Sequence, residues 1–311
     1  MPDPIDTHFD RLVEAHFDKA PAGLYEPVRY ILASGGKRMR PRLVLLGADL
    51  GGGDPQAALT NAFGIELFHN FTLVHDDIMD KADVRRGHPA VHARYGLNAG
   101  ILSGDLMVVK ALQLAADRNG AVDPGMFRLM VDTATEIYEG QQLDVDFEDR
   151  TDTSADDYIE MIRLKTAVLL GCALQLGAMT ADAPADVQHA LYRFGNEIGL
   201  AFQIRDDVLD AFGDDRTGKV VGGDILNNKK TLLVIRARDL GSEAERAALM
   251  SHMASTDRSR AKVDAVRDLF EATGARADVE ARMTDHFDRA MALLEDLDAP
   301  AGPTDRLRTM A

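Results

Sequence analysis

The chain has 311 residues, and its 51 acidic and 35 basic side chains give it a formal net charge of −16. Hydrophobic residues make up 46% of the sequence, which excludes a disordered acidic polymer. The net charge argues against general affinity for nucleic acid or anionic membranes, although a local basic cluster can oppose the net sign. The single cysteine, Cys172, excludes an internal disulfide and a thiolate zinc cage.

The sequence contains neither a recognisable signal peptide nor an obvious membrane span. Its first twenty residues are acidic and amphipathic and lack the apolar core of a signal peptide. The longest apolar stretch, 167–179, includes Gln175 and is shorter than the roughly 20 residues that a spanning helix needs. We therefore expect a cytoplasmic protein with no integral membrane segment.

Helical periodicity dominates the chain from its N-terminus onward. The first helix is predicted from the i, i+4, i+7, i+8 pattern of Ile5, Phe9, Leu12, Val13 and Phe17. Helix breakers then interrupt the pattern at 21–23, 51–55, 119–125 and 183–184. Between them, long helices are predicted over 56–80, 125–148, 156–180 and 186–212. No β-hairpin and no interdomain linker are expected, so we predict an all-α protein in which residues 1–311 form one large helical bundle.

Two aspartate triplets follow apolar helical segments. Asp76, Asp77 and Asp80 form the first aspartate motif (DDxxD), and Asp206, Asp207 and Asp210 form the second. On a helix, such spacing places three carboxylates on one narrow arc, where they repel one another unless a cation neutralises them.

A hard divalent cation such as Mg²⁺ suits these carboxylates, with phosphate and water completing its coordination shell. One such triplet could equally be a solvated helix end, but two copies followed by basic residues favour metal binding. An EF-hand calcium site is disfavoured because its 12-residue loop is missing.

Basic residues accompany both aspartate motifs. Lys37, Arg38 and Arg40 follow a Gly-Gly pair at 35–36, where the backbone can approach an anion closely. Further cations follow the motifs at Arg85, Arg86, Lys219, Lys229 and Lys230. Any one cluster could be a solubilising patch. Beside carboxylates that hold Mg²⁺, guanidinium and ammonium groups favour the binding of diphosphates.

Taken together, these motifs resemble those of the trans-isoprenyl diphosphate synthases, or polyprenyl synthetases. The matching segments are GGKRMRP at 35–41, HNFTLVHDDIMD at 69–80, RRG at 85–87, GQQLD at 140–144, LKTA at 164–167, FQIRDD at 202–207, GK at 218–219 and GDILNNKKT at 223–231. The resemblance implies the isoprenoid synthase type I fold, with a central active-site cavity, and a homodimer. It ends near residue 240, and the last seventy residues carry no recognisable motif. Leu233 stands where many members have proline.

The resemblance also implies the roles of individual residues. Those matching the isopentenyl diphosphate site are Lys37, Arg40, His69 and Arg86. Those matching the allylic diphosphate site are Arg85, Lys165, Lys219 and Lys229. The implied direct ligands of Mg²⁺, with three ions per active site, are Asp76, Asp80 and Asp206, supported by Asp77, Asp207 and Asp210. Thr166 and Gln203 match groups along the path of the allylic carbocation, and Gln141 and Asp144 lie farther from it.

The residue types suit this chemistry. Cleavage of an allylic C–O bond leaves a more negative diphosphate, which cations stabilise, and an apolar helical container keeps water from the carbocation. The resemblance points to the departing diphosphate as the base. His69 is assigned to phosphate binding, whereas His75 and Met79 are interpreted as structural, because Mg²⁺ does not favour imidazole.

Product length is predicted from the residues that precede the first aspartate motif. Phe71 and Thr72 lie five and four positions before Asp76, about one helical turn away. The resemblance implies that this helix forms the floor of the product tunnel. An aromatic ring at this position, without an insertion in the motif, is typical of archaeal-type enzymes of the family. We therefore expect geranylgeranyl diphosphate as the product, with farnesyl diphosphate as the alternative; Phe71 could also be an ordinary core residue.

Two further functions remain open. A class I terpene cyclase shares the fold and one DDxxD motif, but its second metal motif is typically of the Asn/Ser/Glu type. A non-catalytic partner subunit of a heteromeric synthase would tend to lose metal motifs, whereas both are intact here. The condensing enzyme is favoured over both.

Overall fold

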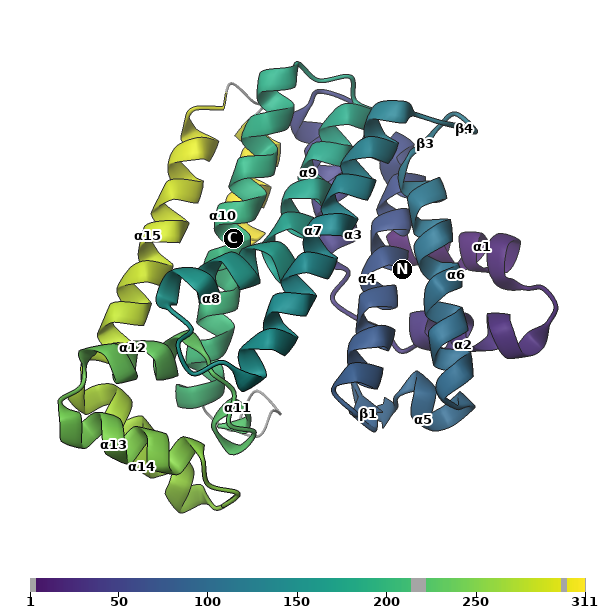
Figure 1. The fold of residues 1–311 in the computed structure, drawn as a ribbon. Helices are drawn as coiled ribbons and strands as arrows, with labels where there is room; N and C mark the ends of the chain where they lie inside the picture. Colours follow the sequence, from purple (N-terminus) through teal and green to yellow (C-terminus); the bar gives the residue numbers. More distant parts are fainter. Residues whose placement is uncertain (1–3, 214–221, 298–300, 311) are drawn as a thin grey trace. The chain divides into compact units, whose positions relative to one another are not determined.

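The computed structural model describes residues 4–213, 222–297 and 301–310, and helices account for nearly all of their regular structure (Figure 1). The predicted all-α class is therefore confirmed. The helices are α1 (Pro4–Phe17), α2 (Ala22–Ala33), α3 (Met39–Leu50), η1 (Pro55–Ala58), α4 (Leu59–Met79), α5 (Val91–Tyr95), α6 (Leu97–Ala115), α7 (Pro124–Asp149), α8 (Ala155–Ile162), η2 (Arg163–Ala167), α9 (Val168–Thr180), α10 (Ala185–Phe212), α11 (Gly223–Leu226), α12 (Leu232–Leu240), α13 (Glu243–Met253), α14 (Arg260–Ala272), α15 (Ala275–Glu295) and α16 (Ala301–Met310).

The described residues fall into two compact units. The first unit comprises residues up to 133, residues 172–192 and the C-terminal helix α16; the second comprises residues 134–171 and 193–297. Helices α7, α9 and α10 contribute residues to both units.

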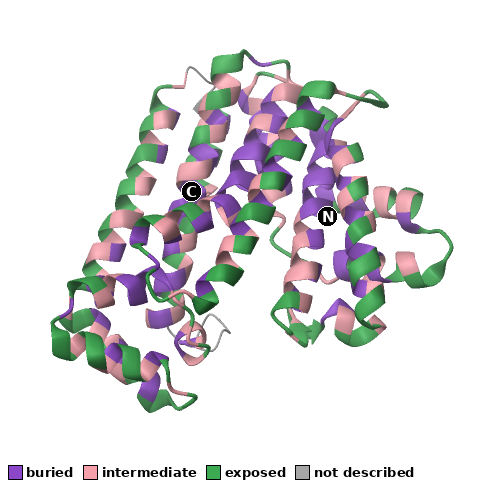
Figure 2. Cartoon of the chain, in the orientation of Figure 1, coloured by how far each residue is buried: buried purple, intermediate pink, exposed green. Residues whose placement is uncertain are grey.

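In the first unit, α4 packs along α6 and also contacts α3 (Figure 1). Figure 2 shows buried residues along much of α4, in keeping with a helix whose side chains are apolar on most faces. The ring of Phe9 on α1 meets Phe63 on α4 edge-on, at 5.0 Å between ring centroids. Burial of α4 thus holds the first aspartate motif, at its C-terminal end, on a rigid element.

In the second unit, one apolar cluster joins α8, the end of α10, and helices α12 to α15. Its members include Ile204 and Val208 on α10, which flank the second aspartate motif, and Phe270 on α14. The surface helices α13 and α14 are largely exposed and contribute few residues to this cluster (Figure 2).

Among the described residues, two short antiparallel hairpins interrupt the helical pattern, so the expectation of no hairpin was wrong. Strands β1 (Val84–Arg85) and β2 (His88–Pro89) pair with each other, as do β3 (Asp117–Arg118) and β4 (Ala121–Val122). The second hairpin turns at Asn119 and Gly120, with φ of 55° and 86°. Asn-Gly is the preferred pair for this turn, and segment 119–125 was misread as a simple helix break.

The helical stretch Ala155–Thr180 is longer than the apolar run 167–179 suggested. It contains an 18-residue window with a mean hydropathy of 1.3, long and apolar enough to cross a membrane by length and composition alone. Because 78% of this window is buried within the protein, the stretch is better explained as a core helix.

Candidate active site

The first aspartate motif lies at the C-terminal end of α4. Asp80 caps the helix, and its backbone N–H donates to the carbonyl of Asp76 at 2.8 Å. Its side chain is exposed, whereas Asp77 is 1% exposed. Carboxylates at a helix C-terminus add to the negative end of the helix dipole, so this position demands a cation. Met79, interpreted as structural, is 46% exposed.

Arg85 supplies one such cation. Arg86 and Gly87 form the turn between β1 and β2, and their positive φ angles of 54° and 78° are those of a tight hairpin turn. Arg85 precedes this turn and reaches α4. Its Nε donates to both carboxylate oxygens of Asp77 at 2.8 and 2.9 Å, and its Nη2 donates to Oδ1 at 2.6 Å. A bidentate pair of this kind fixes the geometry of both side chains.

Four arginines act electrostatically on His69, a partly buried residue of α4. The Nη1 of Arg40 lies 3.3 Å from Nε2 of His69. Burial, and then the positive charges of Arg40, Arg86, Arg85 and Arg38, lower the pKa of His69 well below its ordinary value. His69 is therefore neutral at physiological pH, in a region of positive potential that favours an anion.

The four arginines have different partners. Burial is the main cause that lowers the pKa of Arg40 to about 10, which leaves it charged near neutrality. Arg38 instead pairs with the buried carboxylate of Glu66 at 2.5 Å. Arg86 lies 3.4 Å from the hydroxyl of Ser34 and donates to the carbonyl of Gly35, which joins the hairpin to the glycine pair. Lys37 is exposed on the same segment.

The two residues predicted to set product length lie on α4. Phe71 is 5% exposed, and its ring meets those of Phe68 and His75 edge-on at 5.3 and 4.9 Å. The hydroxyl of Thr72 donates to the carbonyl of His69 at 2.8 Å. The Nε2 of His75 lies 3.2 Å from the carbonyl of Ile101 on α6, which supports a structural role for His75.

The second aspartate motif lies in the last turns of α10. Asp207 is buried, its Oδ2 accepts a hydrogen bond from the hydroxyl of Tyr158 at 2.6 Å, and its Oδ1 accepts one from Gln203 at 3.2 Å. Burial is the largest cause that raises the pKa of Asp207 to about 7, and the two donors oppose it. Asp206 is partly exposed, and Phe202, one turn earlier on the same helix, is 37% exposed.

Asp210 organises the segment that follows. Its Oδ1 accepts from the backbone N–H of Asp224 at 2.9 Å, and its carbonyl accepts from Gly222 at 2.7 Å. The ammonium group of Lys229 lies 3.7 Å from the carboxylate of Asp224. A predicted allylic diphosphate residue is thus brought near the second aspartate motif. Lys219, another, lies outside the described residues.

Lys165 and Thr166 lie in η2, a π-helical segment between α8 and α9. Such segments insert a residue into a helix and often mark functional sites. The Nζ of Lys165 is 2.5 Å from Asp144 on α7, and Thr166 lies 3.4 Å from Gln203 on α10. The structure therefore joins four residues from three matching motifs of the sequence.

The carboxylates have the donor chemistry that Mg²⁺ requires. Within residues 4–213, 222–297 and 301–310, no three acidic, histidine or cysteine side chains are grouped as a metal site of their own. Mg²⁺ is commonly held by one or two carboxylates together with substrate phosphates. Partly exposed aspartates beside arginine and lysine fit that mode of binding.

Two contributors to the site were missed in the sequence. Neither Tyr158 nor Asp224 was assigned a role from the sequence, and each forms a hydrogen bond with an aspartate of the second motif. Tyr158 lies about two helical turns before Lys165 on an amphipathic helix, and its spacing resembles that of an ordinary core residue. Only the fold reveals its partner.

Comparison with known proteins identifies the family to which the chain belongs. Residues 21–271 match the family model described as polyprenyl synthetase. The chain belongs to the polyprenyl synthetase family. It is 40% identical, over 93% of its length and 89% of the relative's, to a short chain isoprenyl diphosphate synthase of Methanothermobacter thermautotrophicus.

Solved structures agree with this membership. The chain matches a crystal structure of geranylgeranyl pyrophosphate synthase with a TM-score of 0.89 and 40% identity, covering 97% of this chain and 94% of the other. It also matches a geranylgeranyl pyrophosphate synthase of Corynebacterium glutamicum complexed with isoprenyl diphosphate and magnesium, with a TM-score of 0.84, 28% identity, and 98% and 94% coverage. The chain is accordingly a prenyltransferase, as predicted.

Proposed function

We propose that this prenyltransferase condenses isopentenyl diphosphate with allylic diphosphates, in the presence of Mg²⁺, and releases geranylgeranyl diphosphate. The observation that carries the proposal is the set of arginines around neutral His69. An anion site beside the first aspartate motif suits the isopentenyl diphosphate that a condensing enzyme needs in addition to its allylic substrate. A terpene cyclase has no use for a second diphosphate.

Each residue would act through charge or position. Arg40, His69 and Arg86, together with exposed Lys37, would bind isopentenyl diphosphate, while Lys165, Lys219, Lys229 and Arg85 would hold the allylic diphosphate. We propose Asp76, Asp80 and Asp206 as the ligands of Mg²⁺, three ions per active site, with Asp77, Asp207 and Asp210 holding them in place. When bound, Mg²⁺ would neutralise charge that develops on the departing diphosphate. Thr166 and Gln203 would line the path of the allylic cation, and the departing diphosphate would accept the proton.

Several wider assignments belong to the same proposal. We propose that residues 1–311 act as one catalytic domain, so that both aspartate motifs serve one reaction. The cytoplasm is the proposed location, because both substrates are water-soluble and multiply charged. A homodimer is the proposed assembly, supported by the exposed apolar side chains of α6.

The decisive experiment uses the purified chain with isopentenyl diphosphate, each allylic diphosphate in turn and Mg²⁺. We expect release of inorganic diphosphate and stepwise extension to a C20 product, identified by mass spectrometry. A cyclic hydrocarbon would support a cyclase, and absence of turnover without a partner would support a non-catalytic subunit. Arg40→Gln should raise the KM for isopentenyl diphosphate about tenfold or more, whereas Arg42→Gln, an exposed change on the same helix, should not.

Product length has its own test at Phe71. Its ring is buried on α4, a little over one turn before Asp76. If the ring floors the tunnel, Phe71→Ala should yield products longer than those of the wild type. Phe68→Ala removes a buried neighbouring ring of the same helix and should lower stability without lengthening the product. Unchanged products from Phe71→Ala would leave Phe71 as an ordinary core residue.

A further inference from the structure

A buried lysine lies in the C-terminal part of the chain, where the sequence showed no motif. Lys262, in the first turn of α14, is 2% exposed. Lysine is rarely buried, because its ammonium group must replace water with other partners. Here the Nζ of Lys262 donates to Oδ1 of Asn228 at 2.6 Å and to the carbonyl of Ser255 at 3.0 Å. Both of these hydrogen-bond partners are neutral, and the carboxylate of Asp257 also acts favourably on the ammonium charge.

Asn228, the partner of Lys262, has an unusual backbone conformation. Its φ is 57°, in the left-handed region that non-glycine residues seldom adopt. The side chain is held at both ends, since its Nδ2 also donates to the carbonyl of Ser255 at 3.2 Å. The backbone N–H of Asn228 donates to Ile225 at 3.1 Å and closes the turn after α11. Lys262 therefore stabilises a turn whose geometry depends on Asn228.

That turn aims the next residue, Lys229. The backbone N–H of Lys229 donates to the carbonyl of Asp224 at 2.9 Å, and its ammonium group lies 3.7 Å from the Asp224 carboxylate. Asp224 in turn donates its N–H to Asp210. A continuous series of contacts thus runs from Lys262 through Asn228 and Lys229 to the second aspartate motif, all within the second unit.

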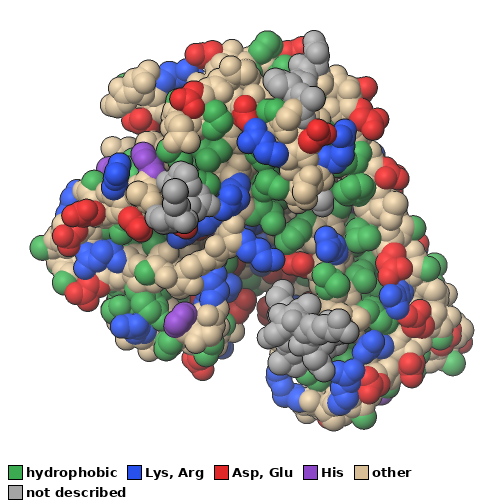
Figure 3. All heavy atoms as spheres, turned by 180° about the vertical axis from the view of Figure 1, so that it is seen from behind, with side chains coloured by type: hydrophobic (Ala, Val, Ile, Leu, Met, Phe, Trp, Pro, Cys, Tyr) green, Lys and Arg blue, Asp and Glu red, His purple; other side chains and the backbone are tan. Residues whose placement is uncertain are grey.

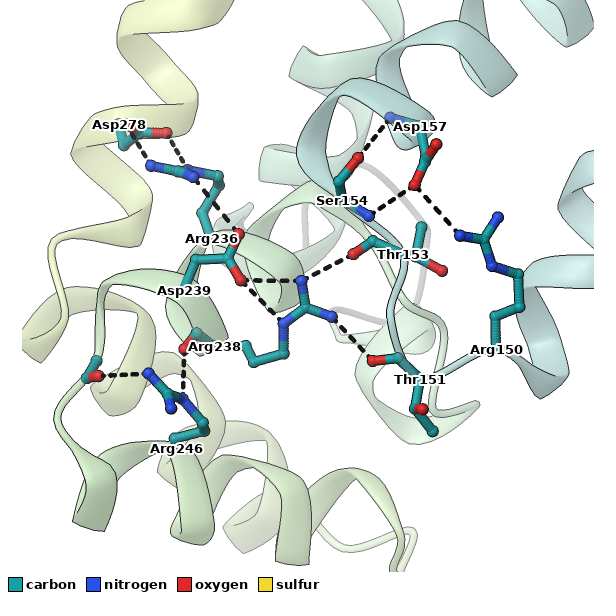
Figure 4. A network of polar contacts seen from close by, with 11 residues as sticks. Arg150, Thr151, Thr153, Ser154, Asp157, Arg236, Arg238, Asp239, Arg246 and Asp278 are labelled. Atoms are coloured by element: carbon teal, nitrogen blue, oxygen red, sulfur yellow. Dashed lines mark hydrogen bonds and ion pairs between the residues drawn. The ribbon is translucent and has the colours of Figure 1, made fainter.

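The same segment is anchored on its other side by Lys230. Its Nζ donates to the carbonyls of Phe147 and Glu148 at 2.9 and 2.8 Å, and also to that of Arg150, at the C-terminal end of α7. The adjoining loop is held from α12: Figure 4 shows Arg238 reaching the carbonyls at 151 and 153. Lys229 consequently lies between two fixed neighbours, although its own side chain is 61% exposed.

We infer that Lys262 is a positioning residue for the allylic diphosphate, because it holds Asn228 in the conformation that directs Lys229 toward the second aspartate motif. The inference rests on the proposed function, in which Lys229 binds that diphosphate. Lysine is a mobile point charge, so its contribution to binding depends on the backbone that presents it. A role of this kind would explain why α14 carries a charged side chain at a buried position.

The test uses Lys262→Met in the full chain, since methionine fills a similar volume without a donor. We expect the KM for the allylic diphosphate to rise about tenfold, with the KM for isopentenyl diphosphate changed less than about twofold. Without substrate, hydrogen exchange should accelerate at the amides of Asp224 and Lys229. Lys262→Arg, which keeps a donor for Asn228, should recover part of both effects.

Two further variants keep the inference falsifiable. Val266→Ala should destabilise the same helix at a fully buried position while it keeps the hydrogen bond between Lys262 and Asn228, and it should leave the ratio of the two KM values unchanged. If Lys262→Met fails to fold, Asn228→Gly removes the same contact while glycine keeps the left-handed backbone, and it should reproduce the rise in KM. An unchanged allylic KM in a folded variant, or an equal change in Val266→Ala, would overturn the inference. Failure of the proposed function would appear separately, as a wild type without chain extension.

Discussion

Asp207 is buried and its pKa is raised. We therefore predict that the stability of the folded protein depends on pH through this residue. Its pKa in the folded protein is about 7, against about 3.9 in an unfolded chain. Between these two pH values the folded state binds more protons than the unfolded state. The contribution of Asp207 to the free energy of unfolding therefore falls as pH rises. The loss approaches about 1.4 kcal/mol per pH unit and ends above pH 7.

The measurement is the free energy of unfolding of the metal-free protein at about pH 5 and about pH 6.5. Asp207→Asn cannot titrate, so we expect the wild type to lose about 1–2 kcal/mol more than this variant between the two conditions. Taking the difference between the two proteins removes the titration of all other groups. Equal losses in both would show that Asp207 does not titrate in this window.

Residues with strong chemistry could be chosen from the sequence, but residues that act through them could not. The two aspartate motifs and the arginines within 38–40 and 85–86 can be recognised in the sequence by their charge and spacing. Tyr158 and Lys262 are each joined to a partner more than thirty positions away, and no local pattern specifies such a pairing. Residue type gives no help for Lys262, because lysine is rarely buried and this side chain is 2% exposed.

At the scale of elements, close packing of α4 against α6 depends on a glycine. A Cβ added at Gly64 would overlap the backbone nitrogen of Ala115 and lie 2.6 Å from its Cα, neither of which can move independently of α6. We expect Gly64→Ala to lower the free energy of unfolding by about 3 kcal/mol, through overpacking. Its measurement is chemical denaturation monitored by circular dichroism.

Gly23 provides the matched control for this substitution. It lies in the first turn of α2, and a Cβ there would meet nothing within 4 Å. Gly23→Ala should be neutral or stabilise the protein by up to about 1 kcal/mol, because alanine restricts the unfolded chain and favours helix. A Gly64→Ala variant as stable as Gly23→Ala would mean that α4 and α6 can separate without cost.

Long helices were predictable because each presents an apolar face over several turns, and the ends of α7 and α10 lie within one residue of the expected positions. Short elements were not. Hairpin β1–β2 has only two residues in each strand, too few for an alternating pattern. The π-helical segment 163–167 changes neither composition nor periodicity enough to be seen, although it presents Lys165 and Thr166.

For the whole molecule, the net charge of −16 does not oppose the binding of anionic substrates. On the face seen in Figure 3, acidic and basic side chains are interspersed rather than separated into large fields of one sign. In the proposed function the attraction for diphosphate is local, from the arginines that act on His69 and from Lys229 beside Asp224. Screening over about 8–10 Å at ordinary salt limits the influence of distant acidic groups on such sites.

The exposed face of α6 makes the predicted homodimer testable. Its apolar side chains at Leu97, Ile101, Leu102 and Val109 are between 39% and 63% exposed, and their spacing places them on one arc of the helix. Contiguous exposed apolar side chains of this kind favour association with another surface. We expect the wild type to sediment at about twice the 33.9 kDa chain mass, since a dimer would cover this face.

Leu102→Glu combined with Val109→Glu should convert that dimer to a monomer, because each carboxylate would be buried without a partner at a cost of several kcal/mol. Leu240→Glu is the matched control. Leu240 is also an exposed leucine, at 46%, but it belongs to α12 in the second unit and not to α6. Its sedimentation should equal that of the wild type. A monomeric wild type would contradict the dimer itself, and a double variant that stays dimeric would place the interface elsewhere.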